Sequence, residues 1–197
     1  MKRTELKHQA IVDAAIALFL EQGYGKTRVD DIAAKAEVSK RTVYKHFENK
    51  EALFFHILES MMLLFDEHGV VVDEDSDFSE QLVQLLLGKI NMLCNPDLIN
   101  ISKIVLAATL NNDVDLSEVQ NKLNKPEGAL LVFLQKALKE GLLKAESAEE
   151  LESWLVATIK GRLFWPQLLQ YRSAPSDAEK YDLAKQLSRL FLYEFAG

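Results

Sequence analysis

Residues 39–50 read SKRTVYKHFENK and combine cationic, hydroxyl and aromatic side chains in a form that suits contact with a phosphate backbone. Ser39 and Asn49 are both good helix N-caps, so they bracket a short helix and open a longer one. Val43 and Phe47 are spaced i, i+4 and can anchor the short helix from below. Its other positions are Lys40, Arg41, Thr42, Tyr44, Lys45 and His46. This pattern is typical of a recognition helix, although a solvated surface helix would carry similar residues.

Two more helices are predicted before this segment. Apolar residues within Leu6–Gln22 recur at i, i+3, i+4, i+7 and i+8, which is the stripe of an amphipathic helix, and Gly23 ends it. Thr27 is the predicted N-cap of a shorter helix over residues 28–36. Glu37 and the valine after it make a tight turn into the recognition helix. Two short helices joined by such a turn form a helix-turn-helix.

Charge is distributed unevenly along the 197 residues, whose net charge is −7. Residues 1–50 hold 10 Lys and Arg against 7 Asp and Glu, whereas residues 51–197 hold 13 against 23. This asymmetry predicts a basic nucleic-acid-binding segment, called the reader below, at the start of an otherwise acidic protein. Cys94 is the single cysteine, which fits a reducing cytoplasm, and no apolar run reaches the roughly 20 residues of a membrane span. We therefore expect a cytoplasmic protein without a membrane segment.

The segment from Ile11 to Leu58 reads IVDAAIALFLEQGYGKTRVDDIAAKAEVSKRTVYKHFENKEALFFHIL and resembles the DNA-binding domain of the TetR/AcrR family of bacterial transcriptional regulators. The resemblance implies a recognition helix in the major groove of double-stranded DNA. It implies phosphate contacts at Thr27, Tyr44, His46 and Lys50, to which Arg28 is added because it starts helix two. It leaves Lys40, Arg41 and Thr42 for base edges, with Lys45 in either role. Arg41 departs from the small residue frequent in the family, and could contact a guanine in bidentate fashion.

The rest of the chain repeats helical stripes without a strand pattern, so the predicted fold class is all-α with about nine helices. We expect a helix-turn-helix domain over residues 1–50 and a larger helical domain over residues 51–197. Ser147 with Glu150, and Ser176 with Glu179, are predicted capping boxes that start the last two long helices. Pro166 is expected to kink or end the first of these two.

The resemblance also implies a homodimer and a small-molecule effector. The last two helices of the family pair with their twins, which suggests dimer contacts at Leu155, Leu187 and Phe191; each of these could equally belong to the core of one chain. A dimer places two readers one DNA turn apart, as a palindrome requires. The predicted effector pocket is apolar and favours an apolar or aromatic ligand, and its candidate walls are Met92, Ile104, Phe133, Phe164 and Trp165.

The sequence thus predicts a DNA-binding transcriptional regulator, a ligand-responsive homodimeric repressor of a palindromic operator. A helical carrier or protein-interaction module without specific DNA binding is the alternative. An enzyme is not predicted, because Ser, Asp and Glu are scattered in loops and caps without the grouping that catalysis needs. No metal and no cofactor is predicted, since His56 and His68 have no third ligand at suitable spacing.

Overall fold

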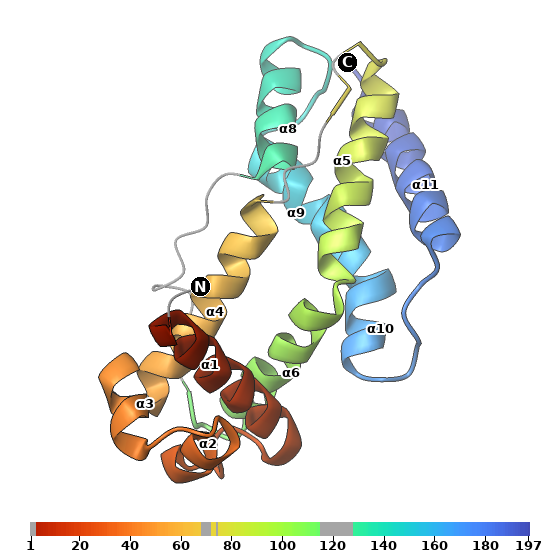
Figure 1. Cartoon of the computed structure of the whole chain (residues 1–197). Helices are drawn as coiled ribbons and strands as arrows, with labels where there is room; N and C mark the ends of the chain where they lie inside the picture. The colour runs from red at the N-terminus through yellow and green to blue at the C-terminus, as the bar shows by residue number, and fades with distance from the viewer. Residues whose placement is uncertain (1–2, 68–71, 74, 115–127) are drawn as a thin grey trace. The chain divides into compact units, whose positions relative to one another are not determined.

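The computed structural model describes residues 3–67, 72–73, 75–114 and 128–197, and for residues 61–67 it describes the backbone alone. Its regular elements in these ranges are helices (Figure 1). The β-structure in these ranges is one isolated antiparallel bridge between Leu143 and Ala196. With the continuous run of α9, η1 and α10 counted as one helix, the described ranges hold nine helices. The predicted all-α fold is therefore confirmed. No helix in the described ranges has the length and apolar character needed to cross a membrane.

The chain divides into two compact units, which we describe separately. The first is built from Met1–Leu64 with Asn100–Lys125, and the second from Phe65–Ile99 with Pro126–Gly197. The predicted short helix near residues 117–123 lies outside the described ranges.

The first unit contains the predicted helix-turn-helix. Its helices are α1 (Arg3–Gln22), α2 (Val29–Lys35), α3 (Lys40–His46), most of α4 (Lys50–Glu67) and the greater part of α6 (Pro96–Leu110) (Figure 1). Gly23 ends α1 with a φ of 87°, which an L side chain rarely adopts, and Glu37 makes the turn before α3 with a φ of 54°. The core of this unit includes fully buried side chains of α1, α2 and α4: Ile11, Ala15, Ile32, Leu53 and Phe54.

The second unit is a helical bundle. It comprises α5 (Phe78–Leu93), α8 (Ala129–Lys139), α9 (Ala148–Ile159), the π-helical turn η1 (Lys160–Phe164), α10 (Trp165–Leu168) and α11 (Asp177–Phe195). Helices α5 and α11 lie side by side (Figure 1). Ser147 caps α9 by accepting a hydrogen bond from the Glu150 N–H, and Ser176 with Glu179 forms the predicted capping box of α11.

The helix that begins at Ala148 continues past the expected break to Leu168, with a π-turn just before Pro166. Proline has no N–H, so the carbonyl four residues earlier, that of Arg162, loses its helical donor. Arg172 Nη1 donates to this carbonyl oxygen at 3.3 Å. The guanidinium of Arg172 also pairs with Glu179 at 2.9 Å, so it ties the π-turn to the start of α11.

The three residues predicted as dimer contacts are core residues of the second unit. Leu155, Leu187 and Phe191 are 0%, 1% and 0% exposed within the single chain, so they have no surface left for a partner. The prediction of dimer contacts at these positions is wrong, and the core alternative is correct for all three. The large exposed apolar and aromatic side chains of the same helical run, of the residue after it and of α11 are Trp154, Trp165, Leu169, Tyr181, Leu190 and Tyr193.

Candidate DNA-binding site

Helix α3 is fixed at both ends and along its inner face. The Ser39 hydroxyl caps it by accepting from the Thr42 N–H at 3.1 Å, and the two hydroxyl oxygens of these residues lie 2.8 Å apart. Val43 is 2% exposed and the C-cap Phe47 is 6% exposed, so both are buried as predicted. The opposite side of a helix this short must then face solvent.

Arg41 and Lys45 form the centre of that solvent-facing side. At 100° per residue, both lie between about 160° and 200° round the helix from Val43. Both are exposed, and within the described ranges no hydrogen bond or ion pair holds either cation. Tyr44 on the flank is 48% exposed, and Thr42 is half-buried. Two cations and two hydroxyl groups are thus presented on one rigid helix.

Lys40 differs from these residues because it already has a partner. Its ammonium nitrogen lies 2.9 Å from a carboxylate oxygen of Asp30 on α2, and both side chains are about half exposed. The hydrogen bond that Lys40 donates to this carboxylate, followed by the charge of the carboxylate, raises the pKa of Lys40. The pair joins the two helices of the helix-turn-helix, and a base contact by Lys40 would have to replace it.

Helix α2 starts one residue later than predicted, which changes the roles of Thr27 and Arg28. The N-cap of α2 is Arg28, whose backbone N–H donates to Asp31 Oδ2 at 3.2 Å, so the N-cap prediction for Thr27 is wrong. Thr27 is 2% exposed and its hydroxyl donates to the Gly23 carbonyl at 2.8 Å. The side chain of Thr27 therefore stabilises the loop and has no surface for a phosphate, whereas Arg28 is exposed.

Lys50, at the start of α4, is bonded to the loop between α1 and α2. Its ammonium donates to the carbonyls of Tyr24 at 2.7 Å, Thr27 at 3.0 Å and Gly25 at 3.4 Å, and lies 4.2 Å from the Tyr24 ring centroid. Burial lowers the pKa of Lys50, and Asp113 opposes this effect. The geometry supports a positioning role for Lys50 in the reader, and the predicted phosphate contact would have to replace these hydrogen bonds.

Replacing Lys50 by methionine is expected to lower the free energy of unfolding by about 1–3 kcal/mol, because three charge-assisted hydrogen bonds are lost. Thermal unfolding should show a midpoint lower by several degrees. The salt dependence of DNA binding should keep its slope. A slope reduced by about one unit per subunit, with an unchanged midpoint, would instead mark Lys50 as a phosphate contact.

Three histidines meet behind the end of α3. His8 Nε2 on α1 lies 2.9 Å from His56 Nε2 on α4, and the His8 ring is 5.5 Å from the His46 ring, centroid to centroid. Phe47 packs against His8 and His56 at 4.9 and 5.3 Å. Burial lowers the pKa of His46 and His56, and the charge of His8 lowers both further. A hydrogen bond between the two Nε2 atoms of His8 and His56 needs an N–H on one ring and an unprotonated nitrogen on the other.

This cluster predicts a loss of stability in mild acid. His46 and His56 have folded-state pKa values below the ordinary 6.5, so the unfolded chain binds more protons just below that pH. The free energy of unfolding should be flat above about pH 6.5 and fall below it. Denaturant titrations of the wild type and a His56→Gln variant at several pH values would measure this. An equal pH dependence in both proteins would contradict the role of His56.

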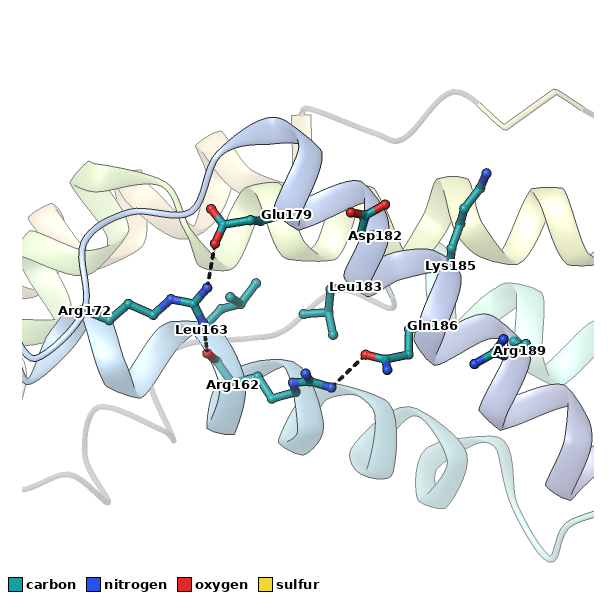
Figure 2. A pocket seen from close by; sticks show the side chains of 9 residues that line it. All are labelled: Arg162, Leu163, Arg172, Glu179, Asp182, Leu183, Lys185, Gln186 and Arg189. Carbon is teal, nitrogen blue, oxygen red and sulfur yellow. Dashed lines mark hydrogen bonds and ion pairs between the residues drawn. The ribbon is translucent and has the colours of Figure 1, made fainter.

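The five predicted pocket residues do not form one group. Ile104 belongs to the first unit, and the other four belong to the second. Phe133 stacks on Phe78 at 4.9 Å, and Phe164 is buried, but Trp165 is 42% exposed. A cavity of about 610 Å³ in the second unit, with charged walls, is lined by none of the five (Figure 2). In the described ranges, no three His, Cys, Asp or Glu side chains could hold a metal ion.

Sequence reasoning missed the Lys40–Asp30 pair and the His8–His56 contact. The first joins residues 10 positions apart across the turn, and the second joins residues 48 positions apart. Opposite charges flanking a predicted turn could have indicated the first. Nothing local in the sequence indicates the second, because it depends on how α1 packs on α4.

Comparisons with known proteins agree with this architecture. Residues 11–57 match the family model described as bacterial regulatory proteins, tetR family, and residues 80–196 match the AefR-like transcriptional repressor, C-terminal domain. A crystal structure of a TetR family transcriptional regulator from Pseudomonas syringae pv. tomato str. DC3000 is 31% identical, with a TM-score of 0.78, over 95% of this chain and 96% of that one.

Two curated relatives extend the comparison. The fatty acid metabolism regulator protein of Bacillus subtilis (strain 168) is 26% identical over 152 residues, 77% of this chain and 76% of that protein. The HTH-type transcriptional repressor DhaR of Mycobacterium sp. (strain GP1) is 44% identical over 59 residues, 30% of this chain and 29% of that one. With the helix-turn-helix and the helical second unit both matched, this chain belongs to the TetR family of bacterial transcriptional regulators and is a DNA-binding regulator of transcription.

Proposed function

We propose that this regulator is a ligand-responsive homodimeric repressor that reads an inverted repeat by placing α3 of each copy in the major groove. The observation that carries the proposal is the outer side of α3, where Arg41 and Lys45 are exposed and without a partner in the described ranges. A buried Val43 holds the helix beneath them. A preorganised row of cations on a short helix suits entry into a groove about 12 Å wide.

Each predicted contact residue of the reader with accessible surface has an assigned role in this proposal. Arg41 and Thr42 meet base edges, and Lys40 joins them after releasing Asp30. The phosphate contacts are made by Lys45 on the outer side of α3 and by three exposed or half-exposed side chains that flank it: Arg28, Tyr44 and His46. Residues 1–50 form the DNA-binding domain, and residues 51–197 bind the effector and the second copy.

The dimer contacts are reassigned to side chains with free surface. Trp154, Trp165, Leu190 and Tyr193 are 43%, 42%, 47% and 89% exposed on the helical run from α9 to α10 and on α11. Large apolar groups that remain exposed on these helices favour coverage by a partner. A second copy that covers them would hold the two α3 helices at a fixed spacing.

The effector site is proposed within the second unit, with Met92, Phe133 and Phe164 as wall residues. Their side chains favour an apolar or aromatic ligand. A curated relative is named as a regulator of fatty acid metabolism, which is in keeping with an apolar effector. Ile104 belongs to the other unit and is not included. The regulator would act in the cytoplasm, where bacterial operators lie.

The dependence of duplex binding on salt tests the proposal against a carrier without specific DNA binding. A dimer that contacts several phosphates through each reader should lose on the order of 10³-fold in affinity between about 50 and 200 mM salt. Fluorescence anisotropy of labelled genomic duplexes would measure it. Binding that is absent, or unaffected by salt, would favour the carrier.

A further inference from the structure

The cavity between the π-turn and α11 has walls of both charge signs. It holds about 610 Å³, and its charged lining residues are Arg162, Arg172, Lys185, Arg189, Glu179 and Asp182. Figure 2 shows the Arg162–Gln186 and Arg172–Glu179 bonds as dashed lines, each 2.9 Å long. These four side chains are held in place, and they fix the two edges of the cavity.

Asp182 and Arg189 are the two charged side chains of this lining that nothing in the described ranges holds in place. Both are exposed, and within the described ranges neither makes a hydrogen bond or an ion pair. Together with Gln186 they follow an i, i+4, i+7 spacing, so they lie within about 60° of one another on α11. The same spacing places them diametrically opposite the buried Phe191. Asp182 precedes Gln186 by one turn, and Arg189 follows it by about one turn.

A two-fold axis passing beside Gln186 would turn this arrangement into a matched pair. In a two-fold interface the same patch appears on both subunits, so residue i meets residue j twice. When two α11 helices run antiparallel about Gln186, Asp182 faces Arg189 of the partner subunit, and Arg189 faces Asp182 of the partner subunit. Trp165, directly after the π-turn, and Leu190 on α11 are exposed and would supply apolar area.

We propose that reciprocal Asp182–Arg189 pairs across the two-fold axis select the correct partner and set the register of the homodimer. The inference rests on the homodimer proposed above and names the residues that decide its specificity. A second copy gives Asp182 and Arg189 each a partner of opposite charge at once. A small anion would be attracted by the cations but repelled by Asp182 and Glu179, so the patch favours a copy of itself.

Two charge reversals test the pairing. Asp182→Arg should weaken the homodimer by at least about 100-fold, because each interface then opposes two pairs of cations; Arg189→Asp should do the same with two pairs of anions. Mixed in equal amounts, the two variants should form a heterodimer of about wild-type affinity, since every cation then faces a carboxylate. Sedimentation equilibrium and native mass spectrometry would measure the populations.

Asp177→Arg is the control, because it makes the same charge change on the same helix but lies about 140° round from Asp182. It also breaks the exposed ion pair between Asp177 and Lys180, so its helical signal is compared with that of the wild type. It should dimerise like the wild type. Wild-type dimers that persist in both single variants, or a mixture that shows no preference for the heterodimer, would overturn the charge pairing and leave the homodimer intact. A monomeric wild type would instead refute the homodimer, and the pairing with it.

Discussion

Replacing Arg41 by alanine is expected to weaken binding to the cognate operator by roughly 10²- to 10³-fold. A bidentate arginine contact with guanine contributes about 1–3 kcal/mol of discrimination, and a dimer loses two of them. Arg41 has no structural partner in the described ranges, so its removal leaves the fold unchanged. Anisotropy titrations at one fixed salt concentration, on the operator and on a scrambled duplex, would measure the loss.

The pattern of the loss distinguishes base reading from general attraction. Arg41→Ala should reduce operator binding far more than scrambled binding, whereas Lys45→Ala should reduce both by similar factors if Lys45 meets phosphate. Lys35→Ala is the matched control, since Lys35 is an exposed lysine at the end of α2 and removes the same charge away from α3. Equal losses on both duplexes for Arg41→Ala would show that Arg41 contacts only the backbone.

Leu187→Asp should destabilise the fold, whereas Leu190→Asp should prevent dimerisation, although both residues lie on α11. Leu187 is 1% exposed, so Leu187→Asp combines a lost apolar side chain with a buried carboxylate. The cost is about 4 kcal/mol or more, against a typical total stability of 5–15 kcal/mol. Leu190 is 47% exposed, so Leu190→Asp should leave a folded chain that no longer dimerises.

Circular dichroism with analytical ultracentrifugation would separate these results. The Leu187→Asp protein should show an unfolding midpoint lowered by ten degrees or more, or should fail to fold. The Leu190→Asp protein should keep the wild-type helical signal and sediment as a monomer. A stable dimer of Leu190→Asp would move the dimer face away from this part of α11.

Much of the fold could be predicted because its signals are local. Ser39 and Ser176 cap α3 and α11 as expected, since a cap depends on residues within one helical turn. Gly23 ends α1 because the left-handed backbone it adopts is open to glycine. The anchoring of α3 by Val43 likewise follows from spacing alone.

The predictions that differ from the structure concern residues whose surroundings depend on tertiary packing. The apolar stripe of α11 identified Leu187 and Phe191 correctly as one face, but a stripe does not reveal whether α5 or a second chain covers it. Thr27 and Arg28 are adjacent, and the buried hydroxyl of Thr27 depends on the carbonyl of Gly23 in the preceding loop. The sequence alone does not show that the Lys50 ammonium donates to carbonyls of that loop, because the loop lies more than 20 residues earlier in the chain.

Selection of bound duplexes from a random DNA pool tests the central claim most directly. The wild-type protein should enrich an inverted repeat whose half-site centres lie about one helical turn apart, roughly 34–36 Å. The Arg41→Ala, Lys45→Ala double variant, which removes the outer side of α3, should enrich none. An enriched repeat that survives in this variant would contradict α3 as the reader, and a single half-site without a repeat would contradict the dimer.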